Sequence, residues 1–351
     1  MRQVGKSTLA TSLVEGKNFV RFNFDLTSDI LDFVNQGRHD LDLFSQKYKD
    51  NIIIIDEIQK SPEATSIVKH LYDNYDFKFI LTGSSEVKIK KGIGDSLAGR
   101  VHVVRLYPLS FEEINLQNNL DWDTKLKYNN YDFNQKALLK NLIYGSLPNL
   151  ENIEVSQYET YLDDYTNLVF SKDVLEVSGT RKPTQVYLLA KLLALQIGQL
   201  VNFNELAINC EMSRVMVYTY IDIFEQMGLI ISAKPISTNE RESISRSTKI
   251  YFTDLGVRNS LIGNFENFNN RIDKGQLLEN AVFVGLKRRL DYDRNQYKLG
   301  FFRSNYGTEI DIVLKTKDNE KLYEVKTGMK NKRLKRNVEI ITLEDAQKFL
   351  Y

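Results

Sequence analysis

The sequence has very few residues suited to disulfides or zinc sites, and it has no long apolar run. Its single cysteine, Cys210, rules out a disulfide within the chain and suits a reducing compartment. The most apolar stretch, 186–201, is interrupted by Lys191 and Gln196 and is too short to cross a bilayer. The histidines are scattered and show no metal-ligand spacing: His39, His70 and His102. We therefore expect a cytoplasmic protein with no secretory signal and no membrane span.

The sequence also has no excess of charge of one sign, because 47 basic and 46 acidic residues leave a net charge of +1. No overall field attracts the protein to nucleic acid, so such a contact would need a local basic patch. A hydrophobic content of 42% with 26% charged residues is typical of a soluble globular protein. A chain of 351 residues is long enough for about two or three domains.

Two acidic residues directly follow a run of four isoleucines, Ile52 to Ile55. Such a run predicts a strand that is buried on both faces. In P-loop nucleotidases an aspartate in the position of Asp56 holds Mg²⁺, and a glutamate in the position of Glu57 can polarise the attacking water. The alternative interpretation is a core strand that ends in a polar turn.

Three residues near the N-terminus match the second half of the phosphate-binding motif G-x-x-x-x-G-K-[ST]: Gly5, Lys6 and Ser7. Glycine lets backbone N–H groups close around phosphate oxygens, and the helix expected from Lys6 directs its positive end at them. Lys6 would reach the β- and γ-phosphates, and Ser7 would bind Mg²⁺. The candidate residues for binding ATP and Mg²⁺ are therefore Gly5, Lys6, Ser7, Thr8 and Asp56.

The motif requires another glycine five residues before Gly5, whereas Met1 stands only four residues before it. We therefore expect that this chain begins inside the loop and that the strand leading into the loop precedes Met1. That strand would be central in the sheet, so its loss leaves backbone groups unpaired. On this reasoning the chain as given binds ATP poorly or not at all.

Strands and helices alternate through the first 115 residues, which predicts a parallel sheet with right-handed crossovers. Strands are expected at 19–24, 52–55, 77–81 and 101–106, and helices at 7–15, 28–36, 40–48 and 62–74. In such sheets ligands bind at the carboxyl ends of the strands, where Gly5, Asp56 and Ser84 all fall.

The chain resembles the large family of prokaryotic AAA-type ATPases that carry an uncharacterised C-terminal region, in the segments RQVGKST, IIIIDEIQ, ILTGSS, SLAGR and LYPLSFEE. The usual loop of that family is GPRQVGKST. The resemblance implies that Thr82 or Ser84 senses the γ-phosphate. It also implies that Arg100 is an arginine finger or sensor arginine, a role that suits charge on phosphoryl oxygens. The alternatives are a turn cap for Ser84 and a surface ion pair for Arg100. Since arginine fingers often act across subunits, a homo-oligomer is one form the protein could take.

The middle of the chain is predicted to be helical. Residues 116–182 are expected to form a helical lid or connector. Residues 183–250 have the pattern of three helices followed by a strand, which is the outline of a winged helix, and the same family carries one here. Its third helix offers Arg214 as its only basic residue together with acidic Asp222, so we favour a packing or protein-contact role over base reading.

The last region, 251–351, contains four residues in an order that resembles the PD-(D/E)xK nuclease fold: Glu279, Asp311, Glu324 and Lys326. The first lies in a predicted helix and the others on predicted strands. In that fold the carboxylates bind Mg²⁺ and the lysine polarises an attacking water. Glu324 and Lys326 are two residues apart, so they point to the same face of a strand. The alternative is an inactive nuclease-like scaffold that keeps these residues as surface charge.

The stretch 326–336 is the one local basic patch. It could contact nucleic-acid phosphates, or it could be the solvated face of a helix.

We expect an α/β protein with four regions: an AAA-like P-loop ATPase core (1–115), a helical connector (116–182), a winged-helix segment (183–250) and a nuclease-like domain (251–351). It would hydrolyse ATP with Mg²⁺ to drive or gate its C-terminal module, together with an unidentified protein partner. The alternatives are a nucleic-acid-binding or cleaving effector with a regulatory ATPase part and an inactive truncated fragment.

Overall fold

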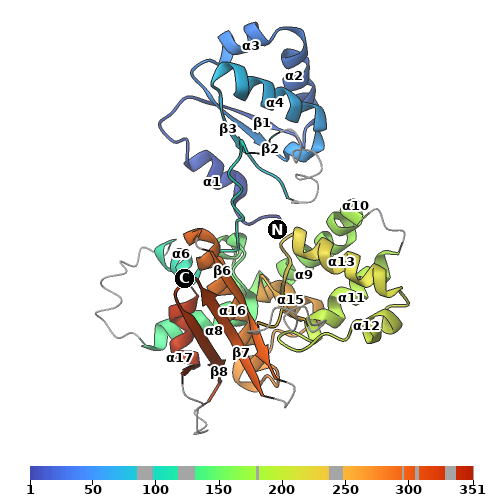
Figure 1. The fold of residues 1–351 in the computed structure, drawn as a ribbon, viewed down its shortest axis with the longest axis vertical. Coiled ribbons are helices and arrows are strands. Elements are labelled where there is room, and N and C mark those ends of the chain that lie inside the picture. The colour runs from blue at the N-terminus through green and yellow to red at the C-terminus, as the bar shows by residue number, and fades with distance from the viewer. Residues whose placement is uncertain are drawn as a thin grey trace. The chain divides into compact units, whose positions relative to one another are not determined.

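The structure is a computed structural model (Figure 1), and it describes residues 1–84, 97, 99–117, 131–178, 182–236, 248–294, 296–304, 308–328 and 337–350. The chain divides into two compact units, unit 1 (Met1–Leu106) and unit 2 (Tyr107–Tyr351). Each unit combines helices with its own strands, so the fold class is α/β, as predicted.

Unit 1 is built on a three-stranded parallel sheet with the strand order β1-β2-β3, which confirms the predicted alternation of strands and helices. Its strands are β1 (Phe19–Asn23), β2 (Ile52–Asp56) and β3 (Lys78–Leu81). Its helices are α1 (Lys6–Ser12), α2 (Thr27–His39), α3 (Leu41–Tyr48), the 3₁₀ turn η1 (Ile58–Lys60) and α4 (Pro62–Tyr75).

The run of isoleucines in β2 supplies both faces of this sheet. Ile53 and Ile55 are fully buried in a core that also contains side chains of α2, α3 and α4. Ile54 points to the other face, where it packs against Ala10 and Val14 in and beside α1. Because successive strand residues alternate between faces, a strand covered on both sides needs an apolar residue at every position.

One predicted strand of unit 1 is wrong. Residues 101–107 lie in neither a helix nor a strand, and the side chains of Val103 and Val104 are 73% and 59% exposed. A strand needs a neighbour that receives its backbone hydrogen bonds. Among the described residues of unit 1, only β1, β2 and β3 pair with one another. The apolar pattern of this segment therefore has no pairing partner there.

Unit 2 opens with helices, as predicted for the middle of the chain. The first group is α6 (Phe111–Gln117), α8 (Tyr131–Tyr144), η2 (Pro148–Asn152), η3 (Val155–Gln157), α9 (Tyr158–Leu168), the π-helix η4 (Val169–Asp173) and α10 (Val174–Ser178). The next elements are α11 (Pro183–Leu195), α12 (Phe203–Asn209), α13 (Arg214–Gln226) and the antiparallel strands β4 (Ile230–Ala233) and β5 (Lys249–Phe252). This order agrees with the predicted outline, while the winged-helix class stays a prediction.

The C-terminal part of unit 2 packs one long helix against a mixed sheet (Figure 1). The elements are α15 (Leu255–Ile262), η5 (Phe268–Asn270), α16 (Lys274–Asp293), β6 (Tyr297–Arg303), β7 (Glu309–Thr316), β8 (Glu320–Val325), β9 (Val338–Ile341), α17 (Leu343–Ala346) and η6 (Gln347–Phe349). The strand order is β6-β7-β8-β9, and only the pair β8–β9 is parallel. Helix α16 contacts both β5 and β8, so it joins the two sheets of this unit.

Two buried arginines hold α15 to the start of α16. Arg258 donates from Nε to the carbonyl of Ala194 at 2.7 Å and pairs with Asp273. Arg271 binds both carboxylate oxygens of Asp273 at 2.8 Å. Burial raises the pKa of Asp273, but the two arginines outweigh this effect and lower it to about 2. The three residues form a buried ion network. Removing one of the partners from such a network is costly, because the remaining charges stay buried without compensation.

Candidate nucleotide site

The predicted phosphate-binding residues stand at the start of α1. Gly5 precedes the helix with φ 87°, in the left-handed region that favours glycine. Its carbonyl accepts the first hydrogen bond of the helix from the N–H of Leu9, at 2.8 Å. The ammonium of Lys6 donates to the carbonyl of Met1, also at 2.8 Å. A left-handed turn into a helix is a backbone form that directs N–H groups at an anion.

Asp56, at the carboxyl end of β2, is the centre of a polar cluster. Its side chain is only 4% exposed. Its Oδ1 accepts hydrogen bonds from the hydroxyls of Ser7, at 3.1 Å, and Thr82, at 2.8 Å. Its Oδ2 accepts from Nε of Arg21 at 2.7 Å, and Nη2 of that guanidinium lies 2.5 Å away. The structure therefore brings Ser7 and Asp56 into direct contact, although 49 positions separate them in the sequence.

Glu57 has a strained backbone and a separate set of partners. Its φ of 56° lies in the left-handed region, which is uncommon for a residue with a side chain and often marks a functional site. Its Oε2 accepts hydrogen bonds from the hydroxyl of Ser84 at 2.9 Å, from the N–H of Ser84 at 3.2 Å and from the amide of Gln59. The two candidate sensors therefore contact different acids, because Thr82 binds the aspartate and Ser84 the glutamate.

Arg100 forms an ion pair within unit 1. Its Nε donates to Oδ1 of Asp73 at 2.7 Å, and its side chain is 36% exposed. This hydrogen bond is the main reason why the pKa of Asp73 is lowered. The contact agrees with the alternative of a surface ion pair, and the role of an arginine finger stays a prediction.

A groove runs along α1 and the start of β1, with an open volume of about 710 Å³. Ser7, Thr8 and Arg21 are among the residues that line it. Arg21 therefore borders a ligand-sized space and binds the carboxylate of Asp56 at the same time.

In unit 2 the nuclease-like residues have two sets of direct partners, although Asp311 is close enough to Glu279 to help raise its pKa. The first set surrounds Glu279. This residue of α16 is 9% exposed and accepts hydrogen bonds from the ammonium of Lys249 at 3.0 Å and the hydroxyl of Tyr251 at 2.7 Å. The same ammonium lies 2.8 Å from a carboxylate oxygen of Glu309. Burial raises the pKa of Glu279 to about 7, although the Lys249 ammonium opposes the shift.

The second set contains Asp311, Glu324 and Lys326. The ammonium of Lys326 lies 2.6 Å from Oε2 of Glu324 and 4.0 Å from Oδ2 of Asp311. Oδ2 of Asp311 also accepts the N–H of Val325 at 2.8 Å, and burial raises the pKa of Asp311. In the part of the chain that the structure describes, no three His, Cys, Asp or Glu side chains are grouped so that they could hold a metal ion. The expected ligand set is therefore not preformed.

Two expectations concern the outer surface. The predicted basic stretch 326–336 lies mostly outside the described residues, which stop at 328 and resume at 337. Among the helices of the described chain, none combines the length and the hydropathy needed to cross a membrane.

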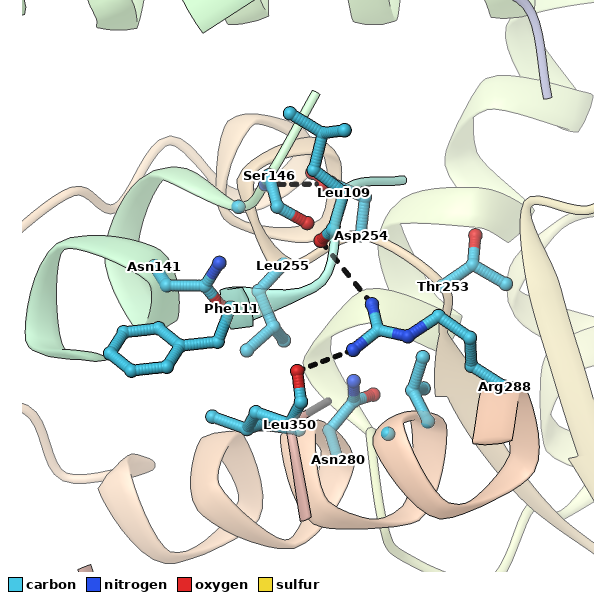
Figure 2. A pocket seen from close by; sticks show the side chains of 14 residues that line it. Leu109, Phe111, Asn141, Ser146, Thr253, Asp254, Leu255, Asn280, Arg288 and Leu350 are labelled. Carbon is cyan, nitrogen blue, oxygen red and sulfur yellow. Dashed lines mark hydrogen bonds between the residues drawn. The ribbon is translucent and has the colours of Figure 1, made fainter. Parts of the chain in front are cut away.

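A small cavity in unit 2 is bordered by Asp254, Asn280 and Arg288 (Figure 2). Its volume is about 30 Å³, roughly the space of one water molecule. The guanidinium of Arg288 donates to the carbonyls of Leu109 at 3.2 Å and Leu350 at 2.5 Å, as the dashed lines in Figure 2 indicate. Burial raises the pKa of Asp254 to about 6. The cavity is too small for an organic ligand, and its polar groups bind chain segments to one another.

Two basic residues at these sites, Arg21 and Lys249, were missed by the sequence analysis. Strand alternation places Arg21 on the face opposite Phe22, but which acid it meets depends on the register of β1 and β2. In that register Asn23 stands beside Asp56, so the long Arg21 side chain reaches the carboxylate from two residues away. For Lys249 the sequence offers no signal beyond a lysine that begins an apolar strand.

The three parts of the chain match three known protein families. Residues 1–115 match the family described as an AAA domain. Residues 135–267 match a domain of unknown function (DUF8612), and residues 274–349 match a second domain of unknown function (DUF4143). The N-terminal part is therefore an AAA domain, a class of domain that binds nucleotides, usually with Mg²⁺.

Similar proteins occur in bacteria and archaea, and those compared are uncharacterised. An uncharacterised protein of Haemophilus influenzae is 26% identical over 278 residues, which is 78% of this chain and 66% of the relative. One from Methanocaldococcus jannaschii is 28% identical over 298 residues, which is 81% of this chain and 63% of the relative. The chain thus spans slightly less than two thirds of the length of these relatives. Their names assign no activity, so a function has to be argued from the site.

Proposed function

We propose that unit 1 binds ATP together with Mg²⁺ at the carboxyl end of β2. The observation that carries this proposal is the contact between the Ser7 hydroxyl and the buried carboxylate of Asp56, at 3.1 Å. Hydroxyl and carboxylate oxygens are the ligands that suit Mg²⁺ beside phosphates, so these two residues fit the ion. The match of residues 1–115 to an AAA domain supports a nucleotide as the ligand.

The residues of α1 would hold the phosphates. The left-handed turn at Gly5 allows the N–H groups of the first helical turn, including that of Thr8, to face phosphate oxygens. Lys6 would exchange its contact with the carbonyl of Met1 for oxygens of the β- and γ-phosphates. When bound, Mg²⁺ adds positive charge that stabilises the phosphates during transfer.

Glu57 is the proposed residue for orienting and polarising the attacking water. Its Oε2 is bound by the Ser84 hydroxyl at 2.9 Å. A γ-phosphate that takes this hydroxyl would remove one of the three hydrogen bonds to this oxygen and leave that position for water, so that sensing of ATP and activation of water would be linked through Ser84. Thr82 would keep the Asp56 carboxylate oriented through its hydrogen bond of 2.8 Å. For Arg100 to act as an arginine finger, it would have to leave Asp73 and reach the site of a second copy of the chain.

We further propose that ATP turnover drives or gates unit 2. Tyr107 is the first residue of this unit, and its hydroxyl donates to Asp291 of α16 at 2.6 Å. Its N–H donates to the hydroxyl of Tyr292 at 3.2 Å. The first residue after unit 1 is thus hydrogen-bonded to α16, the helix that carries Glu279. A movement of the preceding segment would reach this helix through Tyr107.

The test is a titration with Mg-ATP up to millimolar concentration, combined with an assay of phosphate release, of the chain extended at its N-terminus by a strand and by the first glycine of the motif G-x-x-x-x-G-K-[ST]. Lys6→Ala should lose binding, whereas Glu57→Gln should keep binding and lose hydrolysis. Lys47→Ala is the matched control, because the Lys47 ammonium of α3 donates to the side chain of Gln36 in α2 at 3.0 Å. Weak binding by the chain as given is expected, whereas the absence of Mg-ATP binding by the extended chain would refute the ATP site. Hydrolysis that persists in Glu57→Gln would exclude only the role of Glu57.

A further inference from the structure

Glu279, the helix carboxylate of the nuclease resemblance, already has a cation beside it. The ammonium of Lys249 lies 3.0 Å from Oε1 of Glu279 and 2.8 Å from Oε1 of Glu309. These three residues come from three elements, β5, α16 and β7. The hydroxyl of Tyr251 fills another lone-pair position of Glu279, at 2.7 Å. Oε1 of Glu279 is therefore engaged twice by groups of the chain itself.

This ammonium is enclosed, unlike most lysine side chains. The Lys249 side chain is 2% exposed, and its Nζ lies 5.4 Å from the centre of the Phe301 ring. A lysine is seldom buried unless its charge is paired, because removing an ammonium from water is costly. Two carboxylates and an aromatic face provide that pairing here. A divalent ion binds oxygens at about 2.0–2.6 Å, so it would need the space that the ammonium fills.

We propose that the Lys249 ammonium permanently occupies the cation position of this cluster, so that unit 2 binds no divalent ion at Glu279 and does not cleave nucleic acid by a metal-dependent route. The cluster instead binds β5 to α16 and β7. The pair of Lys326 with Glu324, with Asp311 at 4.0 Å, is the arrangement that the nuclease resemblance itself implies, so the proposal rests on Lys249.

The test counts Mn²⁺ ions bound by the full chain without nucleotide, from the electron paramagnetic resonance signal of free Mn²⁺. Glu279→Gln and Asp311→Asn should bind as many ions as the unaltered chain. Lys249→Met removes the ammonium but keeps the volume of the side chain. This variant should bind one Mn²⁺ ion more than the unaltered chain, with an affinity at least tenfold higher than that of the unaltered chain at this position. Adding Glu279→Gln to that variant should remove the gain. Lys287→Met is the matched control, because Lys287 pairs with the single carboxylate of Asp291, and it should gain none.

The outcomes separate clearly. A loss of one Mn²⁺ on Glu279→Gln or Asp311→Asn in the otherwise unaltered chain would overturn the proposal, since a metal site would then exist beside Lys249. A folded Lys249→Met variant that gains no ion would also overturn it. If Lys249→Met does not fold, the comparison of the unaltered chain with Glu279→Gln and Asp311→Asn decides alone. Equal Mn²⁺ stoichiometry in these three proteins then supports the proposal.

Discussion

Arg21 offers the sharpest test of the nucleotide site, because it binds the carboxylate that Mg²⁺ would need. The change is Arg21→Gln, which shortens the side chain and removes its charge. In the structure the guanidinium binds Oδ2 of Asp56 through Nε at 2.7 Å, while Ser7 and Thr82 bind Oδ1. The variant would keep both hydroxyl contacts and lose only the ion pair. Mg²⁺ would then no longer have to displace a cation from Asp56.

The size of the effect follows from the exposure of the pair. A hydrogen bond to a charged group contributes about 1.5–3 kcal/mol, and exposure to water reduces this. The Arg21 side chain is 40% exposed and that of Asp56 only 4%, so we take about 1 kcal/mol for the contact. Removing that competition should strengthen Mg²⁺ binding about fivefold, since 1.4 kcal/mol corresponds to tenfold.

The assay measures the Mg²⁺ concentration that half-saturates binding of a fluorescent ATP analogue to the same N-terminally extended chain. The half-saturating concentration should fall about fivefold in Arg21→Gln and should stay close to the original in Arg21→Lys, which keeps a cation. Arg38→Gln controls for the lost charge, because Arg38 pairs with Glu63 at an exposed site. A half-saturating concentration that is unchanged or higher in a folded Arg21→Gln variant would refute the view that Arg21 competes with Mg²⁺.

Three further predictions concern unit 2 and are measured by hydrogen–deuterium exchange of α15 and α16 in the full chain. Asp273→Asn should destabilise these helices by about 3–5 kcal/mol, since it leaves two buried guanidinium groups without their carboxylate; exchange unchanged from the original chain would contradict this. The pKa of Glu279 is raised from 4.5 to about 7, so its contribution to the free energy of unfolding is complete below pH 4.5 and is lost as the pH rises through about 7. The free energy of unfolding should fall by about 3 kcal/mol over this range. The variant Glu279→Gln should show no such dependence on pH. Gly256→Ala should lower the free energy of unfolding by about 1–3 kcal/mol or more, because its Cβ would stand 2.1 Å from the carbonyl oxygen of Tyr144. Gly275→Ala is the control and should leave the free energy of unfolding unchanged, because the space around Gly275 is open.

The sequence was sufficient to predict features that depend on local pattern. The isoleucine run predicted a doubly buried strand, and the structure confirms burial of Ile53, Ile54 and Ile55 on two faces. The contact of Ser7 with Asp56 was implied by two motifs that share the carboxyl edge of one sheet. The predicted strand at 101–106 was wrong because an apolar pattern does not reveal whether a pairing partner is present.

Contacts that depend on register or on distant segments could not be predicted in this way. The pair of Arg21 with Asp56 joins positions 35 apart and depends on the alignment of β1 with β2. The pair of Lys249 with Glu279 depends on how β5 packs against α16, for which a single sequence has no signal. The candidate acids could therefore be named from the sequence, but Arg21 and Lys249, which neutralise Asp56 and Glu279, could not.

The two sites differ in how readily their internal cation can be replaced. At the nucleotide site the Arg21 side chain is 40% exposed and borders an open groove, so it can move to phosphate oxygens or water while Mg²⁺ takes its place. In unit 2 the Lys249 side chain is 2% exposed. If its ammonium moved away, the buried carboxylate of Glu279 would lose its partner, a loss worth about 3–5 kcal/mol. An exchangeable cation is compatible with cycles of ligand binding and release, whereas a fixed one is compatible only with a lasting structural contact. The same chemistry, a carboxylate neutralised by a basic side chain, is therefore consistent with the exchangeable metal site proposed for unit 1 and with the lasting contact proposed for unit 2.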